Sequence, residues 1–405
     1  MDTQARTPGQ RPEQGGGWTR RRFAGAVAGA AAVVAVPAPA APPAATPAAR
    51  VAPGPAAPRQ EPPGPRPLYV GTYTSAAGGG TGVTVASYDP ESGRITRTGT
   101  LTGVPDPSYL AVHPDGRTLY AVAERQDGGV TAVRLADRRV LGTRTTGGAG
   151  PCHLSVHPGG RWLLSADYGS GSVTVHPIDA SGALGERTAR VVHTSPPPGP
   201  GQQGPHAHQI VTSPDGRYVL AVDLGTDTVY TYRLDTARGT LTEVAQARTR
   251  PGAGPRHLTF HPGGRYAYLA NELDDTVTVC AYDPSSGRLS VGEPQPTGSE
   301  GGTNYPAQIL VTADGRYAFL ANRGHNSLAR YAVESGGARL RLLGTVPTGG
   351  DFPRQIACAP DGRLLFAANQ RSGTVTVFHV DADGGGLTPA GEPFASPVAV
   401  CALPL

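Results

Sequence analysis

The chain has 405 residues, of which 57 are glycine and 41 are proline, and 38% are hydrophobic. This turn-rich composition, without any long helical periodicity, excludes a helical bundle and favours an all-β domain. The formal net charge of +4 comes from arginines in the first 50 residues, so charge favours neither nucleic acid nor an anionic membrane surface as a partner.

The N-terminal residues 1–40 have the layout of a twin-arginine signal peptide. The sequence Thr19-Arg20-Arg21-Arg22-Phe23 precedes an apolar run of small residues at 24–36, which is too short to remain in a bilayer after the signal is cleaved. Proline and alanine dominate residues 41–67, as in an extended tether. We therefore expect a secreted protein whose folded domain covers residues 68–405. A disordered basic tail is the alternative interpretation of the N-terminus.

Six copies of one short phrase divide the remaining chain into units. The phrase is HPDGR, HPGGR, SPDGR, HPGGR, TADGR and APDGR, and its shared glycines are Gly116, Gly160, Gly216, Gly264, Gly315 and Gly362. Neighbouring glycines are 44 to 56 residues apart, a repeat length typical of β-propellers. Asp-Gly or Gly-Gly supplies the positive φ of a tight hairpin turn between two apolar strands.

Each unit contains the strands of one propeller blade. An apolar strand beginning near a proline precedes the phrase, a second strand follows it, and a third strand alternates in polarity, as at 276–283 and 373–381. A fourth, weaker strand completes the unit. The chain ends supply one more blade, with a second strand at 68–74 and a first strand at 397–404. The sequence thus predicts an all-β, seven-bladed propeller of four-stranded antiparallel blades, closed by pairing of the N- and C-terminal strands, which removes free sheet edges.

Polar residues are predicted to meet at one mouth of the central channel, because the first strand of a blade starts where the second strand ends. The starts of first strands hold His153, His206 with His208, Arg256 with His257, and Arg354. The ends of second strands hold Glu124, Asp167, Asp223, Asn271 with Glu272, Asn322 with Arg323, and Asn369 with Gln370. We expect most of these Asp and Asn residues to cap turns.

The long charged side chains have no such capping role. Arg256 and Glu272 are sixteen residues apart across one hairpin, so we expect them to form a pair at the mouth. With Arg323 and Arg354 nearby, they would bind a small anionic molecule, since guanidinium groups match carboxylates and phosphates. The histidines of the turn phrase, by contrast, are predicted to be structural and to lie at the far face.

Several segments show a family resemblance: YVGTYT, GPCHLSVHP, GPHAHQI, GAGPRHLTFHPGGRYAYLANELDDTVTV, LANRGHNS and GGDFPRQIACAPDGR. From about Leu68 to the C-terminus the chain resembles the seven-bladed lactonase family, which includes propeller-type 6-phosphogluconolactonases and carboxy-cis,cis-muconate cyclases. The resemblance implies hydrolysis or formation of a lactone of a small anionic acid, as in carbohydrate metabolism. It implies that His206, Arg256, Glu272 and Arg323 are catalytic.

The substrate is expected to contact Arg354, His153 and His257 as well. In one hypothetical mechanism the arginines hold the substrate and polarise its carbonyl, while Glu272 or His206 acts as general base on a water. We expect a monomer that needs no cofactor or metal.

Three alternatives stay open from the sequence: a carboxymuconate-type cycloisomerase, a non-catalytic extracellular binding propeller, and a metal site. A metal could be Ca²⁺ on oxygens of Asp223, Asn271, Glu272 and Asn322, or a transition metal on His206 and His208. The neighbouring arginines would repel a cation, which disfavours the metal site. Cys152, Cys280, Cys358 and Cys401 are expected to be small buried residues, and the sequence cannot say whether they pair.

Overall fold

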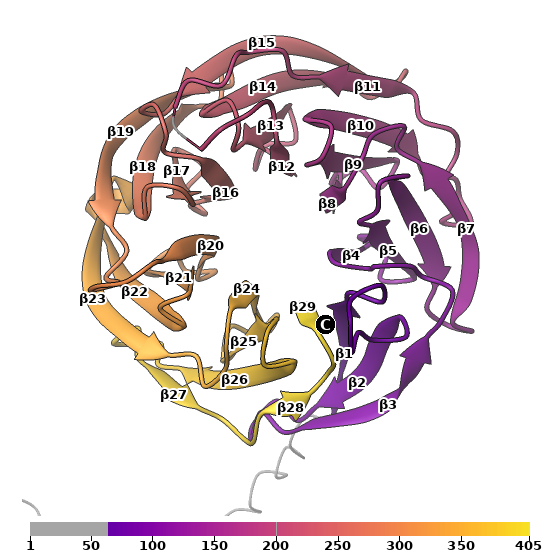
Figure 1. Cartoon of the computed structure of the whole chain (residues 1–405), viewed down its shortest axis with the longest axis vertical. Helices are drawn as coiled ribbons and strands as arrows, with labels where there is room; N and C mark the ends of the chain where they lie inside the picture. Colours follow the sequence, from indigo (N-terminus) through magenta and orange to yellow (C-terminus); the bar gives the residue numbers. More distant parts are fainter. Residues whose placement is uncertain (1–63, 200) are drawn as a thin grey trace, which may run out of the picture. The chain divides into compact units, whose positions relative to one another are not determined.

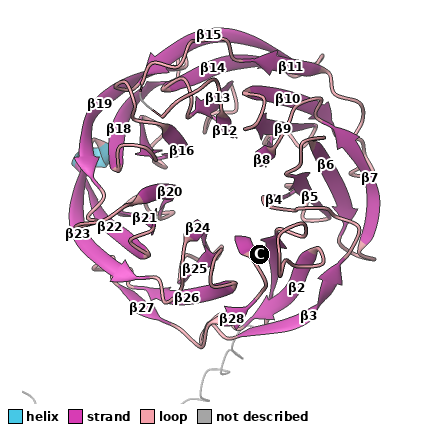
Figure 2. Cartoon of the chain, viewed as in Figure 1, coloured by secondary structure: helices cyan, strands magenta, loops and turns pink. Residues whose placement is uncertain are grey.

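The computed structural model describes residues 64–199 and 201–405, which form a closed ring of seven β-sheets around a central channel (Figure 1). This confirms the predicted seven-bladed propeller. The predicted signal and most of the predicted tether lie outside the described residues, and the first strand begins at Arg66, two residues earlier than expected. Strands and loops make up nearly all of the domain (Figure 2), and no helix of the described ranges is long and apolar enough to cross a membrane.

We number the blades along the chain. Blade 1 contains β29 (Ala399–Pro404), β1 (Arg66–Thr72), β2 (Val83–Tyr88) and β3 (Ile95–Leu101); blade 2 contains β4 (Leu110–Val112), β5 (Thr118–Ala123), β6 (Gly129–Arg134) and β7 (Arg139–Thr145); blade 3 contains β8 (Pro151–Val156), β9 (Trp162–Asp167), β10 (Ser172–Pro177) and β11 (Ala189–Val192). Blade 4 contains β12 (Ala207–Thr212), β13 (Tyr218–Asp223), β14 (Thr228–Asp235) and β15 (Thr240–Arg248); blade 5 contains β16 (Pro255–Phe260), β17 (Tyr266–Asn271), β18 (Thr276–Asp283) and β19 (Arg288–Pro296). Blade 6 contains β20 (Tyr305–Val311), β21 (Tyr317–Arg323), β22 (Ser327–Glu334) and β23 (Arg339–Pro347), with the short helix η1 (Ser335–Gly337); blade 7 contains β24 (Pro353–Cys358), β25 (Leu364–Asn369), β26 (Thr374–Val380), β27 (Leu387–Pro389) and β28 (Phe394–Ala395).

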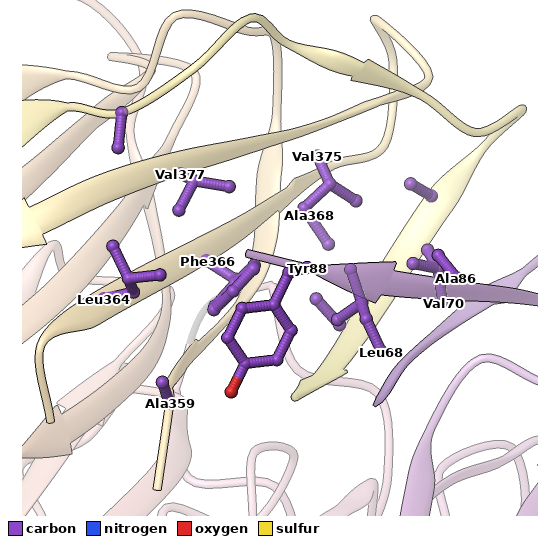
Figure 3. Close-up of a cluster of buried hydrophobic side chains, with 13 residues drawn as sticks. Leu68, Val70, Ala86, Tyr88, Ala359, Leu364, Phe366, Ala368, Val375 and Val377 are labelled. Carbon is purple, nitrogen blue, oxygen red and sulfur yellow. The ribbon is translucent and has the colours of Figure 1, made fainter. Parts of the chain in front are cut away.

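The chain ends close the ring within blade 1, as predicted. The C-terminal strand β29 is the innermost strand of this blade and pairs antiparallel with β1. Side chains of blade 1 then pack against blade 7, where Leu68 and Tyr88 meet Leu364 and Phe366 in one buried cluster (Figure 3). The rings of Tyr88 and Phe366 are 5.0 Å apart and nearly perpendicular. Because each such aromatic or leucine side chain contributes about 1.5–3 kcal/mol on burial, this cluster holds the closure.

The turn phrase lies at the face of the ring opposite the starts of the first strands. All six of its glycines have positive φ, between 68° and 74°, which explains why glycine recurs there. The phrase histidines join neighbouring blades: the Nε2 atoms of His113, His157 and His261 lie 2.8, 3.1 and 3.3 Å from the turn-glycine carbonyl of the next blade. These histidines are therefore structural, as predicted.

The inner strands of the blades are not regular. In β8 the register shifts between Pro151 and His153, so Cys152 has no partner in β9. Corresponding shifts leave unpaired residues in β12, β16, β24 and β29, and we call this set the bulge residues: Cys152, His208, Arg256, Arg354 and Val400. A bulge turns a side chain out of the alternating pattern of a strand, and here all five side chains line one narrow space in the channel.

A second set of side chains lies at or just beyond the ends of the second strands. The backbone N–H of Glu272, for example, donates to the carbonyl of Gly254 in the loop that leads into β16. We call the residues in this position the exit residues: Tyr73, Glu124, Tyr168, Leu224, Glu272, Arg323 and Gln370. The mouth of the channel is thus built from bulge residues of the first strands and exit residues of the second strands.

Candidate active site

The two sets of residues enclose a pocket of about 230 Å³ at the mouth. Its lining consists of Glu124, Cys152, Tyr168, His208, Glu272, Arg323 and Arg354. Below it, the bulge residues narrow the channel to a space of about 10 Å³, roughly the size of one water. The bulge residues therefore close the pocket on the side of the channel. Larger hollows of about 350 and 570 Å³ lie between outer strands and at the turn-phrase face, away from these charged groups.

Arg256, Glu272 and Arg323 form one ion-pair cluster. Glu272 Oε2 lies 2.9 Å from Arg256 Nε and 2.6 Å from Arg323 Nη2. The predicted contact across the β16–β17 hairpin is present, and Arg323 joins it from blade 6. Arg256 is only 1% exposed and is the largest fully buried side chain among the described residues. Its Nη1 atom is buried and has no hydrogen-bond partner, and the side chain lines the narrow space below the pocket.

The charges in this cluster shift one another's protonation. Burial raises the pKa of Glu272, but Arg323 and Arg256 outweigh burial and hold it below its usual value. Burial lowers the pKa of Arg256, and Arg323 lowers it further while Glu272 opposes both. Because a guanidinium keeps its proton even when buried, the cluster holds two cations and one anion at neutral pH.

Arg354 and Glu124 form a second ion pair in the same pocket. Arg354 Nη2 lies 3.3 and 3.4 Å from the two carboxylate oxygens of Glu124. The Tyr73 hydroxyl donates to Glu124 Oε2 at 2.7 Å, and Arg354 also lies over the Tyr73 ring at 5.5 Å. These three residues come from blades 7, 2 and 1, so ring closure brings them together.

The predicted histidines occupy three different environments. His153 and His257 are each 3% exposed and pack edge to face below the pocket, with ring centroids 5.4 Å apart. Burial and Arg256 lower the pKa of His153 to about 3 and that of His257 well below its usual value, so both rings are neutral. Only His257 lines the narrow space, and neither ring lines the pocket.

His206, the imidazole that the resemblance implies as catalytic, lies outside the pocket lining. It stacks on Tyr168 at 4.4 Å, and its Nδ1 lies 2.9 Å from the Tyr168 carbonyl oxygen. The bulge residue His208 lines the pocket instead, with an Nδ1 atom that lacks a partner. Burial and Arg256 hold the pKa of His208 well below its usual value, which keeps the ring neutral.

The sequence analysis placed Glu124 at the mouth without giving it a role, and it did not select Tyr73, Tyr168 and Cys152 for the site. A signal for Cys152 was present in the sequence: Pro-Cys-His-Leu, Ala-His-Gln-Ile, Pro-Arg-His-Leu and Pro-Arg-Gln-Ile align at residues 151, 207, 255 and 353. The second position of each is a bulge residue. Aligning the blades on that position would have selected His208 with Arg256 and Arg354. All four cysteines have free thiols.

The residues considered for calcium have other contacts. Asp223 accepts backbone N–H groups of His206, Gly225 and Thr226, so it caps the blade-4 turn as predicted. The amide of Asn271 donates to two threonine hydroxyls, and that of Asn322 to Ser327 and a backbone carbonyl. Within residues 64–199 and 201–405, no three His, Cys, Asp or Glu side chains are grouped so that they could hold a metal ion.

Comparison with known proteins agrees with this architecture. A sequence model for the family described as "Lactonase, 7-bladed beta-propeller" matches residues 67–404. The chain belongs to this family. It is 34% identical over 296 residues to a 6-phosphogluconolactonase of Bacillus subtilis, covering 70% of this chain and 82% of that protein. The family resemblance expected from the sequence is therefore confirmed.

Two solved structures of bacterial proteins are similar over most of the chain. The periplasmic gluconolactonase of Pseudomonas aeruginosa is 31% identical with a TM-score of 0.78, covering 84% of this chain and 99% of that one. A putative 6-phosphogluconolactonase of Bacteroides fragilis is 29% identical with a TM-score of 0.77, covering 84% and 98%.

Proposed function

We propose that this protein is an exported lactone hydrolase that opens the lactone of a small anionic acid such as a sugar acid. The observation that supports this best is the gathering of two arginines and two glutamates around one pocket, with a third arginine, Arg256, buried directly below them. The named relatives, which include 6-phosphogluconolactonases and a periplasmic gluconolactonase, support the same reaction class.

The arginines provide the electrostatic part of the reaction. Attack of water on a lactone carbonyl places negative charge on the carbonyl oxygen, and donors that are already in position stabilise that charge. Arg323 lies on the pocket wall, and the unpartnered Nη1 of Arg256 lies below it. Glu272 keeps these two guanidinium groups in position through its single Oε2 atom.

The test is turnover of a lactone panel by purified protein. Glucono-δ-lactone, its 6-phosphate and a carboxymuconolactone would be mixed with the enzyme, and acid release would be followed with a pH indicator above the spontaneous rate. We expect hydrolysis of at least one lactone, and loss of it in Arg323→Gln but not in Arg265→Gln, an exposed arginine of the turn phrase. Saturable binding of a lactone without turnover would instead support a non-catalytic binding propeller.

Export is the second part of the proposal, and the order of basic, apolar and small residues at 1–40 supports it. The periplasmic relative is compatible with it. Replacing Arg20 and Arg21 together by lysine should leave the protein inside the cell, while the unmodified protein appears outside the cytoplasm. Equal export of both forms would contradict a twin-arginine route.

A further inference from the structure

The pocket contains two carboxylates in different environments, and this difference assigns them different tasks. Glu272 belongs to blade 5 and Glu124 to blade 2, which lie on opposite sides of the channel (Figure 1). Both line the same pocket, and both side chains are 19% exposed. A substrate in the pocket would therefore lie between two carboxylates.

Glu272 is poorly suited to accept a proton. Its Oε2 atom has two guanidinium contacts of 2.6 and 2.9 Å, and the arginines hold its pKa below the usual value. Protonation would remove the charge that keeps Arg256 and Arg323 in position. A general base works best when its pKa is near the operating pH, and the environment of Glu272 moves it away from that range.

The ion-pair contacts of Glu124 are longer than those of Glu272, and its shortest contact is with a neutral hydroxyl group. Its contacts with Arg354 are 3.3 and 3.4 Å long, and its one short contact is the 2.7 Å bond from the Tyr73 hydroxyl. A phenol hydroxyl can donate to a carboxylate and can also accept from a protonated carboxyl group. Glu124 can therefore take up a proton while keeping its hydrogen bond to Tyr73.

We propose that Glu124 is the general base of the lactone hydrolysis and that Tyr73 is its positioning residue. Glu124 removes one proton from a water whose oxygen bonds to the lactone carbonyl carbon. When the carbon–ring-oxygen bond then breaks, the protonated Glu124 returns that proton to the departing ring oxygen. The products are a hydroxy acid, which ionises and releases one proton, and the unchanged enzyme. This inference rests on the proposed function.

The experiment compares Glu124→Gln with Glu272→Gln on the best lactone of the panel, using full pH profiles of kcat and KM. Glu124→Gln should lower kcat by about 10²–10⁴-fold, the usual contribution of a general base, with little change in KM. The acidic limb of the kcat profile should disappear in this variant. Glu272→Gln should raise KM and keep the acidic limb, because it disturbs the arginines but leaves the base.

Tyr73→Phe gives a second readout that does not depend on removing the carboxylate. Loss of the hydroxyl that positions Glu124 should lower kcat by about 3–10-fold, the equivalent of one hydrogen bond, with little change in KM. A Glu124→Gln enzyme with near-normal kcat and an intact acidic limb would overturn the inference, as would an unchanged kcat in Tyr73→Phe. Either result would leave lactone hydrolysis itself standing, whereas failure of the unmodified protein to open any lactone would reject the proposed function.

Discussion

The two faces of the ring differ in whether their side chains repeat from blade to blade. At the turn-phrase face the same interaction recurs, and the imidazoles of His113, His157 and His261 each reach the turn glycine of the next blade. At the mouth, the bulge and exit positions recur in the backbone, but their side chains differ from blade to blade. The bulge residues comprise a thiol, an imidazole, two guanidinium groups and an isopropyl group.

The residues that stabilise the ring are therefore different from the residues that would carry out chemistry. Repetition at one face gives three blade junctions the same bond, so no single residue there has a unique role. The mouth uses the same backbone geometry to present unlike groups at neighbouring positions, and these include buried charges that stabilise a fold poorly. Substitutions of the charged residues that line or underlie the pocket should therefore affect activity more than stability, and those at the turn-phrase face the reverse.

The largest effect is expected for Arg256→Met. This change removes a 1% exposed guanidinium whose Nη1 has no partner, so kcat/KM should fall by about 10²–10³-fold, as for loss of an oxyanion-stabilising donor. Stability should fall by less than the roughly 3–5 kcal/mol typical of removing one partner of a buried ion pair, because Glu272 keeps its 2.6 Å contact with Arg323. Lactone kinetics and urea unfolding measure the two quantities.

The matched control is Arg265→Met in the same hairpin. Arg265 is exposed at the turn-phrase face, so neither kcat/KM nor the free energy of unfolding should change much. If Arg256→Met lowered stability by several kcal/mol and kept its activity, Arg256 would be a structural residue and the contrast between the faces would fail.

The architecture could be predicted from the sequence because the determinants of the blades are local and repeated. A turn glycine with apolar strands on both sides defines a hairpin wherever it occurs, and closure follows from the two incomplete units. The Arg256–Glu272 contact could be predicted for the same reason, since one hairpin brings the two residues together.

The details of the pocket could not be predicted because bulges break the two-residue period of a strand. Alternation alone gives no reason to prefer Cys152 over the more polar His153, or His208 over His206. The register shifts decide that Cys152 and His208 line the pocket. The contact of Tyr73 with Glu124 could not be predicted from the sequence for another reason. It joins two different blades, and no pattern within one repeat contains it.

A smaller, pH-dependent effect is expected for Asp167→Asn at the mouth. Burial raises the pKa of Asp167 from 3.8 to about 6, and its Oδ1 atom has no partner. Because the folded state binds this proton more tightly than the unfolded chain, the native protein loses stability as pH rises from about 4 to about 6. Asparagine avoids this cost, so urea unfolding should show a gain of about 1–3 kcal/mol at pH 8 that disappears near pH 4.

Asp223→Asn is the matched control for Asp167→Asn, because it replaces the same position one blade later. Asp223 accepts three backbone N–H groups and also contacts His193. Placing an amide there should cost about 1–3 kcal/mol, since buried donors lose their acceptor. Equal responses of the two variants at pH 8 would show that position in the blade, and not local hydrogen bonding, decides the effect.

The smallest effect is expected for His113→Ala at the turn-phrase face. The His113 Nε2 atom lies 2.8 Å from the carbonyl oxygen of Gly160, and its Nδ1 accepts the backbone N–H of Asp115. A single partly exposed hydrogen bond contributes about 0.5–1.5 kcal/mol, so thermal unfolding should shift by only about 2 °C. Three copies of the phrase already have another residue at this position, Ser213, Thr312 and Ala359, which indicates that the ring tolerates junctions without this imidazole. The values of kcat and KM should not change, and a loss of activity in His113→Ala without a loss of stability would mean that the turn-phrase face takes part in the chemistry of the mouth.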